Sequence, residues 1–331
     1  MASLQETAKA LVADGKGILA ADESSGTIQK RFDSLKIACT EANRRDYREM
    51  LFRAKGAGEY ISGVILYDET IRQKAADGTP LVEVLRQAGI VPGIKVDKGT
   101  KALAFHKGET VTEGLDGLRE RLDDYYKLGA RFAKWRAVYH IGEGTPSAAS
   151  LTANTHALAR YAALAQEAGI VPIVEPEVLM EGTHDIDECE FVTEEALRAV
   201  FSELAVAEVD LTGMLLKPNM VVSGEDAPEQ ASHQEVAERT IACFRRVVPA
   251  AVPGIVFLSG GQSDEDATIH LNLMNRLGPQ PWKLSFSYGR ALQAAPLKSW
   301  SGHRENLGKA QSAFLERARA NGLATLGRYA A

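Results

Sequence analysis

The sequence predicts an α/β fold in which eight parallel strands alternate with helices. Eight short apolar runs recur along its 331 residues, at 17–22, 63–69, 93–98, 132–136, 171–177, 213–219, 254–261 and 283–290. The runs are continuous rather than alternating, as expected of strands that are buried on both faces of a parallel sheet. Eight strand–helix units close into a (β/α)8 TIM barrel, which is the predicted fold.

Segments with helical patterns lie between these runs, at 41–52, 114–128, 147–168, 193–207, 233–248 and 263–276. Apolar side chains recur at helical spacing in 114–128. Segment 193–207 opens with Thr193 and two glutamates, which is typical of a capped helix N-terminus. A first helix is expected to begin at Ser3, because Glu6 follows at the spacing of a capping box.

An open, doubly wound sheet is the alternative arrangement of the same units. It is disfavoured because no G-x-G-x-x-G motif follows a strand, and no linker separates the chain into halves. We therefore expect residues 1–331 to form a single barrel domain.

The composition is that of an ordinary globular protein rather than one that binds nucleic acid or membranes. The formal net charge is −6, 45% of the residues are hydrophobic, and no long block of Lys or Arg occurs. The N-terminus lacks the basic and apolar regions of a secretory signal, and no apolar run approaches transmembrane length. We expect a cytoplasmic protein with no nucleic-acid or membrane partner.

Cysteine and histidine spacing predicts neither a disulfide framework nor a metal site. Cys39, Cys189 and Cys243 form no C-x-x-C pair, and the seven histidines contain no H-x-x-x-H or H-x-H motif. His184 has acidic neighbours, but a solvated loop is the simpler interpretation of its surroundings.

Nearly every predicted strand ends in ionisable or hydroxyl-bearing side chains. In order they are Asp22, Glu23 and Ser24; Asp68 and Glu69; Lys95 and Asp97; Lys134 and Arg136; Glu175 and Glu177; Lys217 and Asn219; Ser259; and Tyr288 and Arg290. The carboxyl ends of barrel strands converge on one mouth, where barrel enzymes carry their active sites. Any one of these charges also fits a structural ion pair, but the set as a whole favours a catalytic site.

Lys95, Lys134 and Lys217 lie within or at the end of apolar runs, where lysine is unusual. Neighbouring ammonium groups and desolvation both disfavour the charged form, so we expect these lysines to be partly neutral near neutral pH. A neutral lysine can attack a carbonyl carbon and form a Schiff base. The sequence therefore predicts covalent catalysis on a carbonyl substrate.

Carboxylates at the same mouth supply candidate acids and bases. Glu175 and Glu177 are two residues apart on one predicted strand, so their side chains share a face, and both could move protons to and from a carbinolamine. Asp22 is a further candidate base. Paired carboxylates also suit a glycosidase, but three nearby lysines would keep both carboxylates ionised and remove the acid.

Two segments are suited to binding anions. The segments "SGGQS" at 259–263 and "YGR" at 288–290 follow the last two strands, where barrels commonly bind phosphate, and Arg290 offers a bidentate grip. "DESSGT" at 22–27 supplies hydroxyls and a glycine on another strand. Two anion sites flanking a lysine predict a ketose bisphosphate as substrate.

Eight of these segments together resemble the class I fructose-1,6-bisphosphate aldolase family. They are "AADES", "GVILYDET", "GIKVDKG", "FAKWR", "GIVPIVEPE", "LLKPNM", "FLSGGQS" and "FSYGRALQ", and the likeness extends from about Lys16 to Tyr329. The resemblance implies that Lys217 is the Schiff-base lysine and that the partners are a phosphorylated ketose and triose phosphates. It also implies a homo-oligomer, which is a tetramer in the family.

The resemblance further implies a role for each matching residue. Glu175 moves protons during carbinolamine formation and dehydration and is linked to C3–C4 cleavage, Lys134 sets the charge state of Lys217, Glu177 orients the lysine, and Asp22 contacts the C4 hydroxyl. Ser259, Gly260, Gly289 and Arg290 bind the C1 phosphate, and Ser24, Thr27, Lys95 and Arg136 lie toward the C6 phosphate. The protonated imine is itself the electron sink, so no metal or cofactor is expected.

The sequence alone leaves three questions open: the preferred sugar, whether the chain is active, and what replaces a C-terminal tyrosine. Sedoheptulose 1,7-bisphosphate is an alternative or additional substrate, and an inactive scaffold on the same fold is the alternative of another class. Animal members of the family end in a mobile tail with a terminal tyrosine. This sequence ends "GRYAA", and Tyr329 is expected to be too close to the last helix to take that tyrosine's place.

Overall fold

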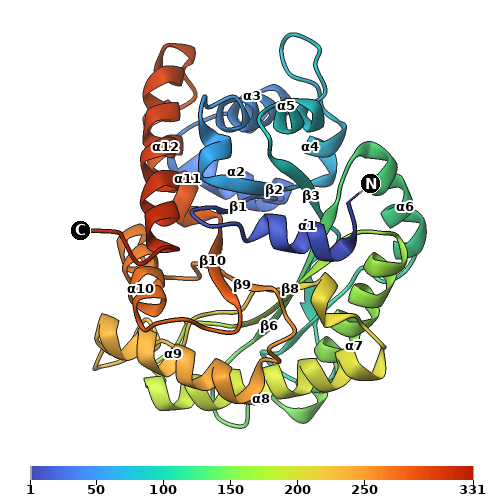
Figure 1. Ribbon diagram of the computed structural model, residues 1–331, viewed down its shortest axis with the longest axis vertical. Helices are drawn as coiled ribbons and strands as arrows, with labels where there is room; N and C mark the ends of the chain where they lie inside the picture. The colour runs from blue at the N-terminus through green and yellow to red at the C-terminus, as the bar shows by residue number, and fades with distance from the viewer. Residues whose placement is uncertain (1, 331) are drawn as a thin grey trace.

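Eight parallel strands form a closed barrel in the computed structural model, which describes residues 2–330 (Figure 1). The strands are β1 (Gly17–Ala21), β2 (Ile61–Leu66), β3 (Val91–Lys95), β6 (Phe132–Tyr139), β7 (Val171–Val178), β8 (Leu215–Leu216), β9 (Gly254–Phe257) and β10 (Lys283–Tyr288). β1 pairs with both β2 and β10, which closes the sheet on itself. The predicted TIM barrel is therefore confirmed.

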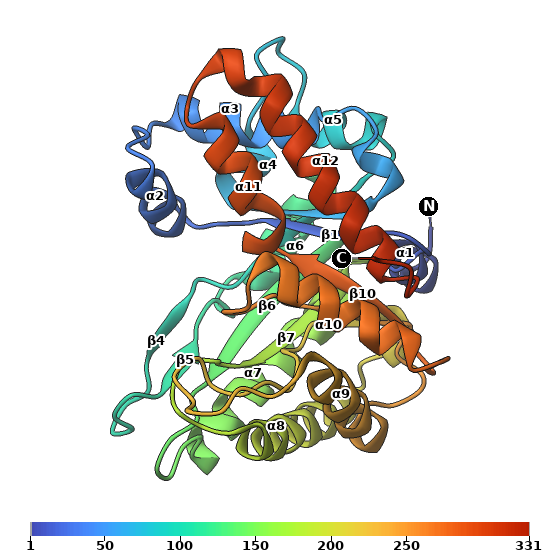
Figure 2. The ribbon, with the colours of Figure 1, turned by 90° about the vertical axis from the view of Figure 1, so that its left-hand side faces the viewer.

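Helices surround the barrel, and most of them cover its outer face (Figures 1 and 2). They are α1 (Leu4–Leu11), α2 (Ser25–Ser34), α3 (Glu41–Phe52), α4 (Asp68–Arg72), α5 (Leu81–Gln87), α6 (Leu118–Leu128), α7 (Ala148–Glu167), α8 (Ile186–Val206), α9 (His233–Val247), α10 (Asp264–Arg276), α11 (Arg290–Trp300) and α12 (Leu307–Ala324). In Figure 2, α1 lies at one end of the barrel, and α2 lies at the opposite end with a hairpin of β4 (Thr100–Ala102) and β5 (Thr110–Thr112). Among residues 2–330, no helix combines the length and the apolar character that a membrane crossing requires.

The local helix signals in the sequence are mostly correct, with two exceptions. The capping box of Ser3 and Glu6 is present at the start of α1. The prediction that a helix begins at Thr193 is wrong: α8 begins at Ile186 and is capped by Asp185, whereas Thr193 is buried in its interior. α6 begins at Leu118 rather than at residue 114, because Gly117 before it has a left-handed backbone that interrupts the helix.

Trp135 and His184 are both buried. Trp135 points into the helix layer, and its ring stacks on Tyr161 of α7 with centroids 5.7 Å apart. His184 was expected in a solvated loop, but it is buried, and within residues 2–330 neither of its ring nitrogens has a hydrogen-bond partner. Tyr329 donates its backbone N–H to Asn272 of α10. Met1 and Ala331 lie outside the described residues.

Aromatic rings and α1 fill the amino-terminal end of the barrel. Leu11 and Phe132 are fully buried in one inner cluster together with Ile18, Ile65, Val171 and Val256. Glycines on neighbouring strands make room for the rings: a Cβ on Gly17 would lie 2.6 Å from Phe286, and a Cβ on Gly93 would overlap the ring of Phe132. These contacts fill the amino-terminal end of the barrel with close-packed side chains. The cavity with the candidate site lies at the opposite end.

Gly93→Ala tests this packed end. The added methyl overlaps the Phe132 ring, so the free energy of unfolding should fall by about 2–3 kcal/mol in urea denaturation. Gly308→Ala is the matched control on α12, where a Cβ meets nothing within 4 Å. It should leave stability unchanged or raise it by about 0.5–1 kcal/mol. Equal stability of the two variants would contradict the packing described here.

Candidate active site

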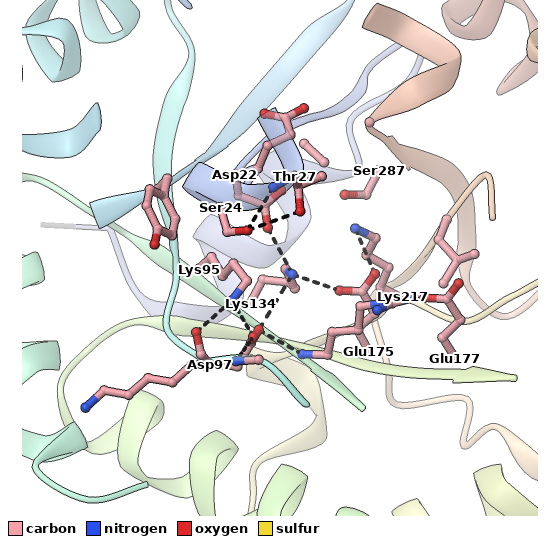
Figure 3. Close-up of a pocket in the computed structure, with 18 of the residues that line it drawn as sticks. Asp22, Ser24, Thr27, Lys95, Asp97, Lys134, Glu175, Glu177, Lys217 and Ser287 are labelled. Carbon is pink, nitrogen blue, oxygen red and sulfur yellow. Dashed lines mark hydrogen bonds and ion pairs between the residues drawn. The ribbon is translucent and has the colours of Figure 1, made fainter. Parts of the chain in front are cut away.

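A cavity of about 1100 Å³ opens at the carboxyl ends of the strands (Figure 3). Its lining includes every residue that the sequence analysis selected. They are Asp22, Ser24, Thr27, Lys95, Lys134, Arg136, Glu175, Glu177, Lys217, Ser259, Gly260, Gly289 and Arg290. The prediction that these side chains converge is therefore confirmed.

Lys217 lies directly after the short strand β8. Its backbone N–H donates to the Val174 carbonyl of β7 at 2.8 Å, which continues the pairing of the two strands for one more residue. Only 4% of the residue is exposed, and its Nζ lies 3.1 Å from Oε1 of Glu175. The buried ammonium thus has a carboxylate partner, as a buried charge requires.

Glu175 lies between two lysines. Its Oε1 faces Lys217, and its Oε2 lies 3.3 Å from Nζ of Lys134 on β6. Glu175 is 3% exposed, so its carboxylate interacts with both lysines away from bulk water. The lower effective dielectric constant there strengthens the attraction between opposite charges. Glu175 can therefore exchange a proton with Lys217 without a solvent intermediate.

Lys134 is surrounded by carboxylates, as Figure 3 shows. Its Nζ lies 2.9 Å from Asp22 and 3.7 Å from Asp97, in addition to Glu175. Burial lowers the pKa of Lys134, but the charges of Asp22, Glu175 and Asp97 outweigh burial and raise the pKa above its usual value. The expectation that this lysine is partly neutral is wrong, because each nearby lysine is matched by carboxylates.

Asp22 follows β1 and is held ionised by the same contacts. Burial raises the pKa of its carboxyl, but the charges of Lys134 and Lys217, with the hydrogen bond from Lys134, lower it to about 2. The carboxylate is therefore an acceptor throughout the neutral range and is available as a base.

Arg136 and Glu177 form a second pair on the β6–β7 side. The Arg136 guanidinium donates to Glu177, and the Arg136 backbone N–H donates to Asp97 at 3.2 Å. Burial lowers the pKa of Arg136, but Glu177 and the nearby carboxylates outweigh it and raise the pKa. In residues 2–330 the ion-pair partner of Glu177 is Arg136, so an effect of Glu177 on a lysine has to pass through other groups.

Asp97 is a residue of the site that the sequence analysis noted at a strand end but did not select. It is 8% exposed, its carboxylate binds Lys95, and the Lys95 Nζ also donates to the Asp97 carbonyl at 2.7 Å. The K-x-D spacing of Lys95 and Asp97 at the end of β3 is the sequence signal for this residue. Asp97 links Lys95 to Lys134 and to the backbone of β6.

One end of the cavity is suited to an anion through its backbone. Gly260 has a φ of +53°, and Gly289 precedes the first residue of α11, so N–H groups of this helix end face the site. Arg290 donates to the Gly260 carbonyl at 2.5 Å. Ser287 of β10, which the sequence analysis did not select, lines the cavity, and its buried hydroxyl has no hydrogen-bond partner within the described chain.

The other anion-binding end lies at the start of α2. Ser24 caps this helix by accepting from the Thr27 N–H, and the two hydroxyls are 3.1 Å apart. Arg31 of the same helix also lines the cavity and is bound to Glu23 at 2.5 Å. Arg31 was not selected from the sequence, because nothing in a helical pattern shows which face points into a cavity.

Among residues 2–330, no group of three or more His, Cys, Asp or Glu side chains is arranged to hold a metal ion. The closed barrel, with ionisable side chains gathered at the carboxyl ends of its strands, defines a (β/α)8-barrel enzyme.

Comparison with known proteins specifies the family. The sequence model for "Fructose-bisphosphate aldolase class-I" matches residues 3–331. A Xanthomonas axonopodis pv. citri protein named "Probable fructose-bisphosphate aldolase class 1" is 59% identical over 98% of each chain. "Fructose-bisphosphate aldolase 4, cytosolic" of Arabidopsis thaliana is 56% identical over 95% of this chain and 80% of its own.

A solved structure shows the same likeness in three dimensions. It is fructose-bisphosphate aldolase from Plasmodium falciparum, in complex with TRAP and a small-molecule inhibitor. The two chains are 51% identical with a TM-score of 0.98, over 99% of this chain and 95% of that one. The chain described here belongs to the class I fructose-bisphosphate aldolase family.

Asp22→Asn tests the charge network through stability. The native pKa of Asp22 lies below its unfolded value of about 3.8, so its ion pairs stabilise the fold above pH 4. This stability is lost as the pH falls toward 2. Wild type should therefore lose about 2 kcal/mol more unfolding free energy between about pH 5 and pH 2 than the variant.

The measurement is urea denaturation at several pH values, with the exposed Asp116→Asn as control. If the unfolding free energies of wild type and Asp22→Asn change in parallel with pH, then Lys134 and Lys217 do not lower the pKa of the Asp22 carboxyl.

Proposed function

We propose that the chain cleaves fructose 1,6-bisphosphate reversibly to dihydroxyacetone phosphate and glyceraldehyde 3-phosphate through a Schiff base on Lys217. The observation that carries this proposal is the buried Lys217–Glu175–Lys134 arrangement between two anion-binding ends of one cavity. Membership of the class I aldolase family supports it.

Schiff-base formation requires Lys217 to lose a proton. Oε1 of Glu175, 3.1 Å away, is placed to accept that proton, after which the amine attacks the C2 ketone. Protonated Glu175 then donates to the hydroxyl of the carbinolamine, and water leaves to give the iminium. Lys134 stays cationic throughout, because three carboxylates surround it, and its charge lies 3.3 Å from Oε2 of Glu175 during these steps.

Cleavage then breaks the C3–C4 bond. Asp22, ionised at neutral pH, takes the proton of the C4 hydroxyl as the aldehyde forms. The bonding electrons move to the iminium nitrogen and leave an enamine, so the protonated nitrogen serves as the electron sink. Protonation of the enamine at C3 and hydrolysis release the second product and restore Lys217.

The phosphates determine which way the substrate lies. We assign the C1 phosphate to Ser259, Gly260, Gly289 and Arg290, where glycine backbone and a helix N-terminus meet. We assign the C6 phosphate to Ser24, Thr27 and Lys95, with Arg136 as a further contributor. Glu177 acts by holding Arg136 in place.

Borohydride trapping tests substrate class, mechanism and lysine together. In the presence of dihydroxyacetone phosphate, reduction should leave one covalent adduct that peptide mass mapping places on Lys217. Lys217→Arg should lose the adduct and at least about 10³-fold of kcat/KM. The exposed Lys309→Arg should retain both.

Activity should also survive EDTA. An adduct on a different lysine would overturn the assignment of Lys217. Absence of turnover in a coupled assay would favour an inactive scaffold. The ratio of kcat/KM for fructose 1,6-bisphosphate to that for sedoheptulose 1,7-bisphosphate measures the preference between these sugars.

We further propose that residues 1–331 act as one catalytic domain in a cytosolic homo-oligomer, a tetramer by analogy with the family. The cytosolic location is supported by the name of the Arabidopsis relative. Sedimentation velocity measures the oligomeric state, and cell fractionation measures the location.

A further inference from the structure

The turn that follows β9 is anchored to the helix that comes after it. Residues 258–263 connect β9 to α10. Within this turn the Ser259 carbonyl accepts two hydrogen bonds from Gln262, at 3.1 Å from its backbone N–H and at 3.3 Å from its side-chain amide. The Gln262 Oε1 lies 2.6 Å from Nδ1 of His270, on the second turn of α10. The contacts therefore run from Ser259 through Gln262 to His270.

The hydrogen-bond chemistry determines which atoms donate. The Ser259 carbonyl is an acceptor only, so Gln262 must point its NH₂ group toward it and its oxygen toward the histidine. His270 therefore carries its proton on Nδ1 and donates to Gln262. Burial, with the neighbouring His233, lowers the pKa of His270 to about 4, so the ring is neutral at neutral pH.

His270 is an unfavourable choice for this position if packing is its only role. The residue is 5% exposed, its second nitrogen Nε2 has no hydrogen-bond partner among the described residues, and the ring of His233 packs against it with centroids 4.9 Å apart. A buried nitrogen without a partner costs stability that an apolar side chain would not lose. The bond to Gln262 is the interaction that a leucine could not replace.

The turn needs such an anchor because it contains two consecutive glycines. Gly260 and Gly261 have no side chains that could fix the backbone, and glycine is conformationally free. On the cavity side the turn is held by Arg290, which donates to the Gly260 carbonyl. If Arg290 turns to bind a phosphate, it loses its hydrogen bond to the Gly260 carbonyl. Gln262 is then the remaining side chain that holds the turn.

We propose that His270, acting through Gln262, is a positioning residue that holds the 259–261 turn in the geometry required to bind the C1 phosphate. The proposal rests on the function proposed above, in which Ser259 and Gly260 contact that phosphate. It predicts that His270 governs affinity for the phosphate at C1 and not for the phosphate at C6.

Two substitutions separate the donor from the shape of the ring. His270→Leu keeps most of the apolar volume and removes Nδ1, whereas His270→Asn places an amide N–H close to the position of Nδ1. Steady-state kinetics with fructose 1,6-bisphosphate and with fructose 1-phosphate, which lacks the C6 phosphate, should show KM raised about five- to tenfold for both sugars in His270→Leu. The value of kcat should change by less than about twofold, and His270→Asn should restore KM.

Further variants serve as controls and references. His156→Leu removes an exposed histidine of α7 and should leave both constants unchanged. Thr27→Ala should raise KM for the bisphosphate alone. Gln262→Met should match His270→Leu, and the double variant should be no worse than either single one, because both break the same connection.

The outcomes distinguish this inference from the proposed function. An unchanged KM in both His270→Leu and Gln262→Met, with KM raised in Ser259→Ala, would overturn the inference alone. Equal impairment in His270→Leu and His270→Asn would also overturn it, because the shape of the ring would then be what matters. An unchanged KM in Ser259→Ala would remove the C1 phosphate from this turn, and the inference would fall with that assignment.

Discussion

The site depends on one constraint: a charged side chain that is buried away from water must be paired with an opposite charge. Four carboxylates and four cations meet at the mouth of the barrel, and each has an opposite charge within ion-pair distance. They are Asp22, Asp97, Glu175 and Glu177 with Lys95, Lys134, Arg136 and Lys217. Removal of a single partner from such a cluster leaves an uncompensated charge, which typically costs about 3–5 kcal/mol. The ion pairs of the proposed catalytic groups are therefore also a condition for the stability of the mouth.

The closed barrel gives these pairs their geometry. Glu175 and Lys217 lie on paired strands, and Lys134 lies on the strand that pairs with the other edge of β7. Their relative positions follow from strand register rather than from loops. The turn after β9 and the N-termini of α2 and α11 supply the anion-binding ends. The strands thus hold the groups proposed for covalent chemistry, and turns and helix N-termini hold most of those proposed for phosphate binding.

The sequence predicted more of the site than of the outer fold. Apolar runs identified all eight barrel strands, and the segments at their ends identified thirteen residues that line the cavity, eight of them charged. The charge state of Lys134 was misjudged, because the sequence shows that lysines are near one another but not which carboxylate lies 3 Å away. Arg31 and Ser287 were missed because a helix face and a strand face cannot be oriented before the barrel is assembled. The start of α8 was misplaced because Thr193 and the two glutamates after it resemble a helix cap, although the helical spacing already begins at Ile186, after the true cap Asp185.

The packed amino-terminal end has a consequence for turnover. Phe132, Leu11 and the rest of the inner cluster fill the amino-terminal end of the barrel, and the cavity that holds Lys217 opens at the other end. The sugar enters, the aldehyde departs, water is admitted and the remaining triose leaves, all through the same opening. The triose that is bound to the enzyme cannot be released until the free aldehyde has left through that opening. Events at this opening therefore impose an order on the release of the two products.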